Sequence, residues 1–160
     1  MAKVLVLDQS TRCSGFGYFI SGQYIESGMI DMSKSKLETA ERSFEMAKAI
    51  WKLIDKYKPQ YVILEDVQMQ NNNAKTMLIL ARLQGMILGY AEAHDVRVHI
   101  VLPSRWRSEL SYRQGPKVKR AELKQQSLDY VQEHLGKEMQ EDEAEATALG
   151  FAAHKIYDFE

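Results

Sequence analysis

Two acidic residues stand directly after short apolar runs, a position in which a carboxylate can do chemistry. Asp8 follows Val4–Leu7, and Glu65 follows Tyr61–Leu64. A continuous apolar run of this length is typical of a central strand that is buried on both faces of its sheet. The carboxyl ends of such strands form the edge where α/β proteins bind ligands. The sequence therefore predicts that both acids lie at one edge of a sheet.

A second acidic pair lies late in the chain, where Asp142 and Glu145 are three residues apart. This spacing places both side chains on one face of a helix. If the helix reaches the ends of the two strands, the four carboxylates form one cluster. Converging carboxylates repel one another unless positive charge lies among them. A pair of Mg²⁺ ions meets that need, and such pairs serve phosphodiester chemistry.

Each acid also has a structural interpretation. An aspartate after a strand, such as Asp8, is commonly a turn former or a helix cap. Acids in the first turn of a helix favour its dipole, and Glu141 and Glu143 could do only that. Glu65 has the weakest structural explanation, because nothing local calls for a glutamate at the end of an apolar strand.

The elements that must position these acids follow from the periodicity of the apolar residues. Three strands joined by tight turns, one of them Ser21-Gly22, predict an antiparallel meander. Two further strands alternate with helices, and this order predicts an α/β fold with a parallel part after the meander. The strands are expected at 4–8, 15–20, 23–30, 61–65 and 97–102, and the later helices at about 74–94, 105–112, 118–135 and 142–156.

An earlier helix is expected to open near Ser35 and to end before Pro59. Ser35 and Glu38 have the spacing of a capping box, which predicts its start. Apolar residues at helical spacing predict the face that packs on the rest of the protein. That face consists of Leu37, Ala40, Phe44, Ala47, Trp51, Ile54 and Tyr57.

The helix at 74–94 is apolar nearly all the way round, which predicts contacts on more than one side. Small residues at steps of four form a slim stripe that allows another backbone to approach closely. The favoured interpretation is that this stripe lies on the protein's own sheet, and the alternative is that it packs on a second subunit. The stripe consists of Ala81, Gly85, Gly89 and Ala93.

Composition restricts the class of protein. The 160 residues predict one domain, over 1–160, and 45% hydrophobic with 27% charged residues indicates a globular protein. Cys13 is the only cysteine, which excludes an internal disulfide and fits a reducing compartment. No apolar run approaches a membrane span, so we expect a cytoplasmic protein without a membrane partner. The net charge of −1 does not indicate nucleic-acid binding unless the positive charge is clustered.

Basic residues do crowd one part of the sequence, with only Glu109 and Glu122 among them. Such a cluster is ordinarily a solvated face, but beside an acidic metal site it equally fits a phosphate backbone. Asn71–Asn73 and Lys75 form a second polar surface near Glu65. The basic residues are Arg97, Arg105, Arg107, Arg113, Lys117, Lys119, Arg120 and Lys124.

The sequence resembles the RuvC family of Holliday junction resolvases, within the RNase H-like superfamily, nearly from end to end. Residues 4–8 with 14–18 look like the family's first motif, and residues 62–67 look like the second. Residues 73–85 are similar to the start of its dimer helix. Residues 142–150 look like its final acidic motif.

The resemblance implies an RNase H-like fold, which is a mixed five-stranded sheet with helices on both faces. It implies a homodimer, with the 74–94 helix as the candidate interface. It also implies an endonuclease that resolves four-way junctions and other branched DNA by paired nicks, leaving 5′-phosphates. By position, Asp8, Glu65, Asp142 and Glu145 would hold two Mg²⁺ ions per active site, for which Mn²⁺ can substitute.

The resemblance further implies residues that contact DNA in a bacterial cell or a phage-infected host. The family's basic residue near the scissile phosphate falls at Lys117, Lys119 or Arg120, and the register leaves open which. The expected DNA contacts are Arg12, Gln68, Asn73, Lys75, Arg105, Arg107, Arg113, Lys117, Lys119 and Arg120.

The chain departs from the usual family motifs at several places. Asp8-Gln-Ser10 stands where the cellular enzymes usually have Asp-Pro-Gly, and Glu145 stands where aspartate is commoner. Gln68 and Met69 occupy positions at which many members carry junction-wedging aromatic residues. In these respects the chain looks more like the bacteriophage-type members.

Two alternatives stay open. Asp8-Gln-Ser-Thr11 followed by Gly15 resembles the phosphate motif of actin-like ATPases and sugar kinases, which are phosphotransferases. That group needs two such domains around a cleft, and 160 residues supply one. The other alternative is a junction-binding protein that does not cleave, and the presence of all four acids disfavours it.

Overall fold

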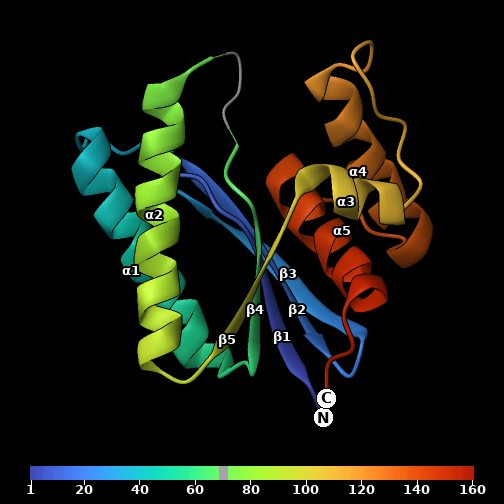
Figure 1. The fold of residues 1–160 in the computed structure, drawn as a ribbon, viewed down its shortest axis with the longest axis horizontal. Helices are drawn as coiled ribbons and strands as arrows, with labels where there is room; N and C mark the ends of the chain where they lie inside the picture. Colours follow the sequence, from blue (N-terminus) through green and yellow to red (C-terminus); the bar gives the residue numbers. More distant parts are fainter. Residues whose placement is uncertain (69–71) are drawn as a thin grey trace.

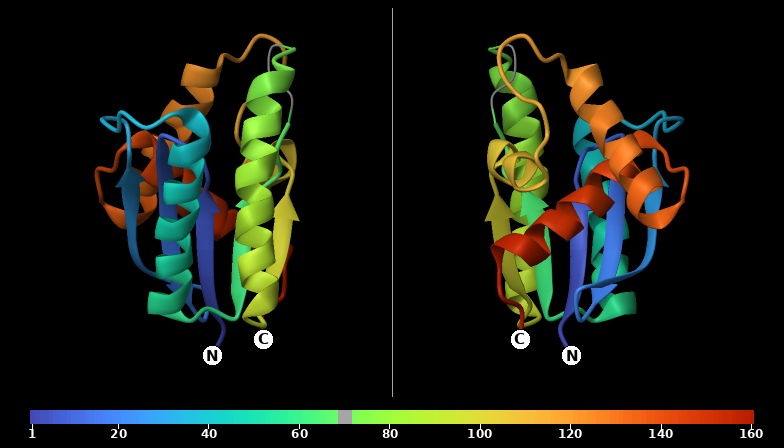
Figure 2. Two further views of the ribbon diagram at one scale, coloured as in Figure 1. Left: turned by 90° about the vertical axis from the view of Figure 1, so that its left-hand side faces the viewer. Right: turned by 90° about the vertical axis from the view of Figure 1, so that its right-hand side faces the viewer.

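A computed structural model describes residues 1–68 and 72–160. A five-stranded sheet lies between two layers of helices, which confirms the expected α/β architecture (Figure 1). The helices α1 (Thr39–Tyr57) and α2 (Ala74–Ala93) cover one face of the sheet, and α5 (Glu141–Ile156) lies across the other (Figure 2). Two more helices, α3 (Pro103–Glu109) and α4 (Arg120–Leu135), pack on α5.

The sheet is mixed and has the strand order β3-β2-β1-β4-β5. The expected meander is confirmed, because β1 (Lys3–Asp8), β2 (Cys13–Ile20) and β3 (Gln23–Asp31) are antiparallel neighbours. The strands β4 (Tyr61–Glu65) and β5 (Arg97–Val101) run parallel to β1. The two apolar runs that precede the acids are therefore central, adjacent strands.

Burial of β1 on both faces is also confirmed. Leu5 and Leu7 pack with α1 and α2, whereas Val4 and Val6 pack with α5, and all four are 0% exposed. Side chains that alternate between two covered faces account for an uninterrupted apolar run. The strand can tolerate a carboxylate only where the covering layers end, which is at Asp8.

The helix α5 approaches β2 closely enough to require glycine. A β-carbon at Gly15 would lie 1.9 Å from the carbonyl oxygen of Asp142, and one at Gly150 would lie 2.2 Å from the ring of Phe19. Gly15 is in turn the antiparallel partner of Asp8. The glycine therefore lets the first turn of α5 lie beside the end of β1.

Two predictions about α1 are wrong. No capping box forms, because the Ser35 hydroxyl accepts a local hydrogen bond from the Leu37 amide and the helix begins only at Thr39. Leu37, Ala40 and Phe44 do not belong to the packed face, since all three are exposed, Leu37 by 40% and Phe44 by 54%. The late start leaves Leu37 outside the helix, and the buried face is Arg42, Ser43, Met46, Ala47, Ile50, Ile54 and Tyr57.

The favoured interpretation of the small-residue stripe on α2 is also wrong. Larger residues, Leu83 and Ile87 among them, face the core and bury more apolar area than the small residues could. Ala81 and Ala93 are exposed, and a β-carbon at Gly85 or Gly89 would meet nothing within 4 Å. The stripe therefore lies on the outer surface of α2. No helix in the described ranges, 1–68 and 72–160, has the length and apolar character needed to cross a bilayer.

Candidate active site

The structure brings the four predicted acids to one edge of the sheet. Leu7 pairs with Leu64 in parallel register, so Asp8 and Glu65 emerge side by side. The first two turns of α5 add Asp142 and Glu145. The pKa of Asp8 is raised well above its usual range, because burial and the charges of Glu65, Glu145 and Asp142 all oppose its ionisation. The acids therefore share one electrostatic environment.

The carboxylates do not yet converge on a common point. Within residues 1–68 and 72–160, no group of three or more His, Cys, Asp or Glu side chains is arranged to hold a metal ion. The chemistry of the donors nonetheless fits Mg²⁺, which takes carboxylate oxygens and would relieve the repulsion that raises the pKa of Asp8.

Glu65 is held by three donors from different parts of the chain. The indole N–H of the fully buried Trp106 donates to Oε2 of Glu65 at 2.7 Å. The side-chain amides of Gln9 and Gln84 each donate to the Glu65 backbone carbonyl at 3.0 Å. Burial raises the pKa of Glu65, and the Trp106 hydrogen bond partly offsets this rise.

Glu145 is held by a buried hydrogen-bond chain. The hydroxyl of Ser127 donates to Oε2 of Glu145 at 2.6 Å and is within 2.9 Å of the hydroxyl of Tyr112, which donates to it. Burial raises the pKa of Glu145, while Ser127 and the charge of Arg107 lower it. The helix α4, which carries Ser127, thus supports the acid from the side away from the sheet.

Sequence reasoning did not identify Trp106, Gln9, Gln84, Ser127 or Tyr112. One local signal was available for Trp106, since a buried indole usually needs a partner for its N–H. The remaining four residues are ordinary polar side chains, and their roles depend on contacts with residues distant in the chain.

Three cations act on the acids. Arg107 places Nη2 3.6 Å from Oε1 of Glu145, and its charge together with that of Arg120 lowers the pKa of Glu65. Lys124 lowers the pKa of Asp8 and of Glu145 and forms a 3.2 Å ion pair with Glu141. The sequence had placed Arg107 and Arg120 among the expected DNA contacts, and Lys124 only in the wider basic cluster that could hold a phosphate backbone.

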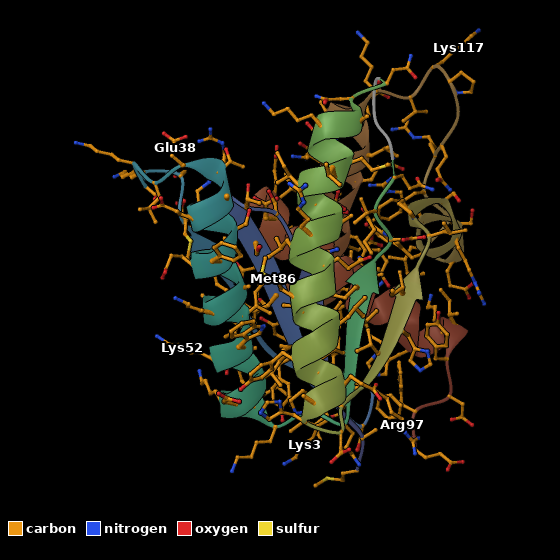
Figure 3. The ribbon with its side chains drawn as sticks, turned by 60° about the vertical axis from the view of Figure 1, so that its left-hand side comes forward. Lys3, Glu38, Lys52, Met86, Arg97 and Lys117 are labelled. Carbon is orange, nitrogen blue, oxygen red and sulfur yellow. The ribbon has the colours of Figure 1, made fainter. Side chains whose placement is uncertain are left out.

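The predicted loop cations lie further out. Lys117 and Lys119 are exposed, and Figure 3 shows Lys117 at the outer end of the segment that joins α3 and α4. The Lys119 amide donates to the Glu122 side chain at the start of α4. Their role near a phosphate stays a prediction.

The expected DNA contacts outside this loop are mostly exposed. Asn73 caps α2, because its Oδ1 accepts from the Thr76 amide at 3.1 Å. Met69 and Asn71 lie outside the described residues. The exposed contacts are Arg12, Gln68, Asn73, Lys75, Arg105 and Arg113.

Arg97, the first of the basic residues that crowd positions 97–124 of the sequence, does not lie beside the acids. Arg97 begins β5 and pairs with Tyr61, whereas Val101 at the other end pairs with Glu65. Figure 3 shows Arg97 near Lys3, at the opposite end of the molecule from Lys117. The five residues of β5 carry the chain from Arg97 at one edge of the sheet to Val101 at the edge where the acids lie. Arg97 is therefore remote from the acids.

Comparison with known proteins places these features in a family. The DUF3882 family, described as Lactococcus phage M3 protein, matches residues 1–151. The crossover junction endodeoxyribonuclease RuvC of Hydrogenovibrio crunogenus is 26% identical over 69% of this chain and 64% of its own length. RuvC of Syntrophomonas wolfei is 31% identical over 60% of this chain and 57% of its own length. The chain thus spans about three fifths of the curated relatives it matches.

Solved structures share the fold at low sequence identity. Thermus thermophilus RuvC, in complex with a Holliday junction substrate, has a TM-score of 0.74 at 16% identity, covering 98% of this chain and 96% of that one. The Fowlpox virus resolvase, in complex with substrate Holliday junction DNA, has a TM-score of 0.68 at 15% identity, covering 96% and 97%. These similarities confirm the expected RNase H-like fold.

Proposed function

The chain belongs to the DUF3882 family, described as Lactococcus phage M3 protein, and we propose that it is an endonuclease that resolves Holliday junctions and related branched DNA. The observation that carries this proposal is the gathering of Asp8, Glu65, Asp142 and Glu145 at one sheet edge in a chain similar to RuvC. Both the sequence similarity and the fold similarity support the same activity.

Asp8, Glu65, Asp142 and Glu145 would hold two Mg²⁺ ions, or Mn²⁺ in their place. When bound, such ions activate a water molecule and stabilise the oxygen that leaves phosphorus, which yields a 5′-phosphate. Trp106 keeps the Glu65 carboxylate in one orientation, and Ser127 does the same for Glu145. Preorganised ligands of this kind lower the cost of assembling the site.

The cations beside the acids would contact the phosphate backbone. Arg107 and Arg120 are placed to offset negative charge near Glu65, and the exposed Lys117 and Lys119 extend this positive surface outward. The proposed DNA surface also includes the exposed residues Arg12, Gln68, Asn73, Lys75, Arg105 and Arg113.

A homodimer would place two such sites on one junction. The exposed stripe on α2 supports this, since Gly85 and Gly89 leave room for a second backbone and Leu78 beside them is 48% exposed. A twofold axis through α2 would present two identical sites, which suits paired nicks in opposing strands. We propose that residues 1–160 form the single domain of each subunit.

A labelled four-way junction, incubated with and without Mg²⁺, tests the proposal. Cleavage that requires Mg²⁺ and disappears in Asp8→Asn and Glu65→Gln, with DNA binding retained, is the expected result. A shifted but uncut junction would instead indicate a binding protein, and nucleotide hydrolysis without DNA would indicate a phosphotransferase. Full cleavage by both variants would overturn the assignment of the acids.

A further inference from the structure

The Arg107 guanidinium lies inside the acidic cluster rather than on its rim. Its side chain is only 16% exposed, and Nη2 is 3.6 Å from Oε1 of Glu145. The guanidinium also lies over the Trp106 ring, 5.2 Å from the centroid, and Trp106 in turn donates to Glu65. One cation thus stands between two of the acids proposed to bind metal.

The contact between Arg107 and Glu145 is electrostatic without a hydrogen bond. A separation of 3.6 Å exceeds the 2.7–2.9 Å of a charge-assisted hydrogen bond. The other oxygen of Glu145 is already taken by Ser127. The Nε atom of Arg107 is buried and has no hydrogen-bond partner in the described part of the chain. A cation held in this way offsets the charge of Glu145, while its buried Nε–H has no hydrogen-bond acceptor in the described part of the chain.

We propose that Arg107 competes with the divalent cation for Glu145, and that DNA relieves the competition by drawing the guanidinium to a phosphate. The inference rests on the proposed function, because it assumes that Glu145 binds metal. The planar guanidinium fork suits a phosphate better than a single carboxylate oxygen at 3.6 Å. Because coupling between two ligands is reciprocal, DNA and the cation would each increase the affinity for the other.

Calorimetric titration of Mn²⁺ into the DNA-free protein tests the competition. Arg107→Gln should bind Mn²⁺ about tenfold more tightly than the wild type, since it removes a positive charge that lies beside Glu145, a proposed metal ligand. Arg107→Lys should keep an affinity close to that of the wild type. Arg97→Gln is the matched control: it also removes one guanidinium charge, but Arg97 lies over Tyr61 at the end of β5 opposite to the acids, so the Mn²⁺ affinity should not change. Unchanged or weaker binding by folded Arg107→Gln would overturn the inference.

A second measurement does not depend on altering Arg107. In Trp51→Phe, Trp106 is the only tryptophan, because the chain has two. Saturating Mg²⁺ should change its emission as the guanidinium leaves its ring, and constant emission at saturation would overturn the competition. If the proposed function itself is wrong, the wild type should neither bind divalent ions nor cut branched DNA. That result would also refute the proposed competition. A wild type that cuts DNA while Arg107→Gln has unchanged Mn²⁺ affinity refutes only the competition.

Discussion

The indole N–H of Trp106 donates a 2.7 Å hydrogen bond to Oε2 of Glu65. The two residues are 41 positions apart in the chain, and the bond joins the short helix α3 to the end of β4. Because Trp106 is fully buried in the layer between α5 and the sheet, it gives the carboxylate a rigid support. The core of the protein thus extends directly into the proposed active site.

Replacing Trp106 by phenylalanine should shift the pH dependence of cleavage. The Trp106 hydrogen bond lowers the pKa of Glu65, so its loss raises that pKa and moves the acid limb of the activity profile to higher pH. The loss of a buried hydrogen bond should also cost about 1–3 kcal/mol of stability. Trp51→Phe is the control, because its indole bonds to the Met86 carbonyl, away from the acids. An unshifted profile in Trp106→Phe would contradict the role of the bond.

Asp8→Asn should be more stable than the wild type at neutral pH when divalent ions are removed by a chelator. The pKa of Asp8 is raised in the folded protein, so its stabilising contribution is present below the unfolded pKa and is lost as pH rises through the folded value. Asparagine carries no charge, so the variant does not lose this stability. We expect its free energy of unfolding to be higher by at least about 1 kcal/mol, or its Tm to be higher by about 2–4 °C. Thermal melts at several pH values measure it. Asp31→Asn, whose exposed carboxylate has a lowered pKa through Ser33, should show no gain.

The thiol of Cys13 should resist alkylation at pH 8. Burial, a hydrogen bond to Asp142 and nearby carboxylates raise the pKa of Cys13 to about 12. A thiol with so little thiolate should react on the order of a thousandfold more slowly with iodoacetamide than free cysteine. Asp142→Asn should accelerate the reaction, because it removes a charge that opposes the thiolate. Equal rates in the two proteins, followed by mass spectrometry, would show that Asp142 does not lie beside Cys13.

Gly85→Arg should yield a folded monomer. The site of its β-carbon is open, and replacement of glycine within a helix favours the helix by about 0.5–1 kcal/mol. A bulky charge on the stripe should nonetheless prevent close packing of two α2 helices. Light scattering should detect monomers, and junction cleavage should change from paired to single nicks. Ala40→Arg, an equally bulky change at an exposed position of α1, should leave the oligomeric state as in the wild type. A Gly85→Arg protein that is still dimeric would exclude α2 as the interface.

Local sequence patterns were sufficient to predict the sheet and two of the acids. The runs before Asp8 and Glu65 are apolar because both faces of β1 and β4 are covered, and each acid marks the point where that cover ends. Burial on both faces produces an uninterrupted run of apolar residues. It can therefore be predicted from the sequence without knowing which elements cover the strand. The spacing of Asp142 and Glu145 likewise revealed a shared helix face.

Only the tertiary structure decided what surrounds those acids. Helical periodicity identifies an apolar face but not its neighbour, so it placed Phe44 in the core and the glycine stripe of α2 against the sheet, and both are exposed. The partners of the acids, Trp106, Ser127 and Arg107, come from segments whose positions depend on how α3 and α4 pack on α5. The sequence thus determined at which strand ends the acidic side chains lie. Packing between distant segments determined which groups meet them, because such contacts leave no local pattern in the chain.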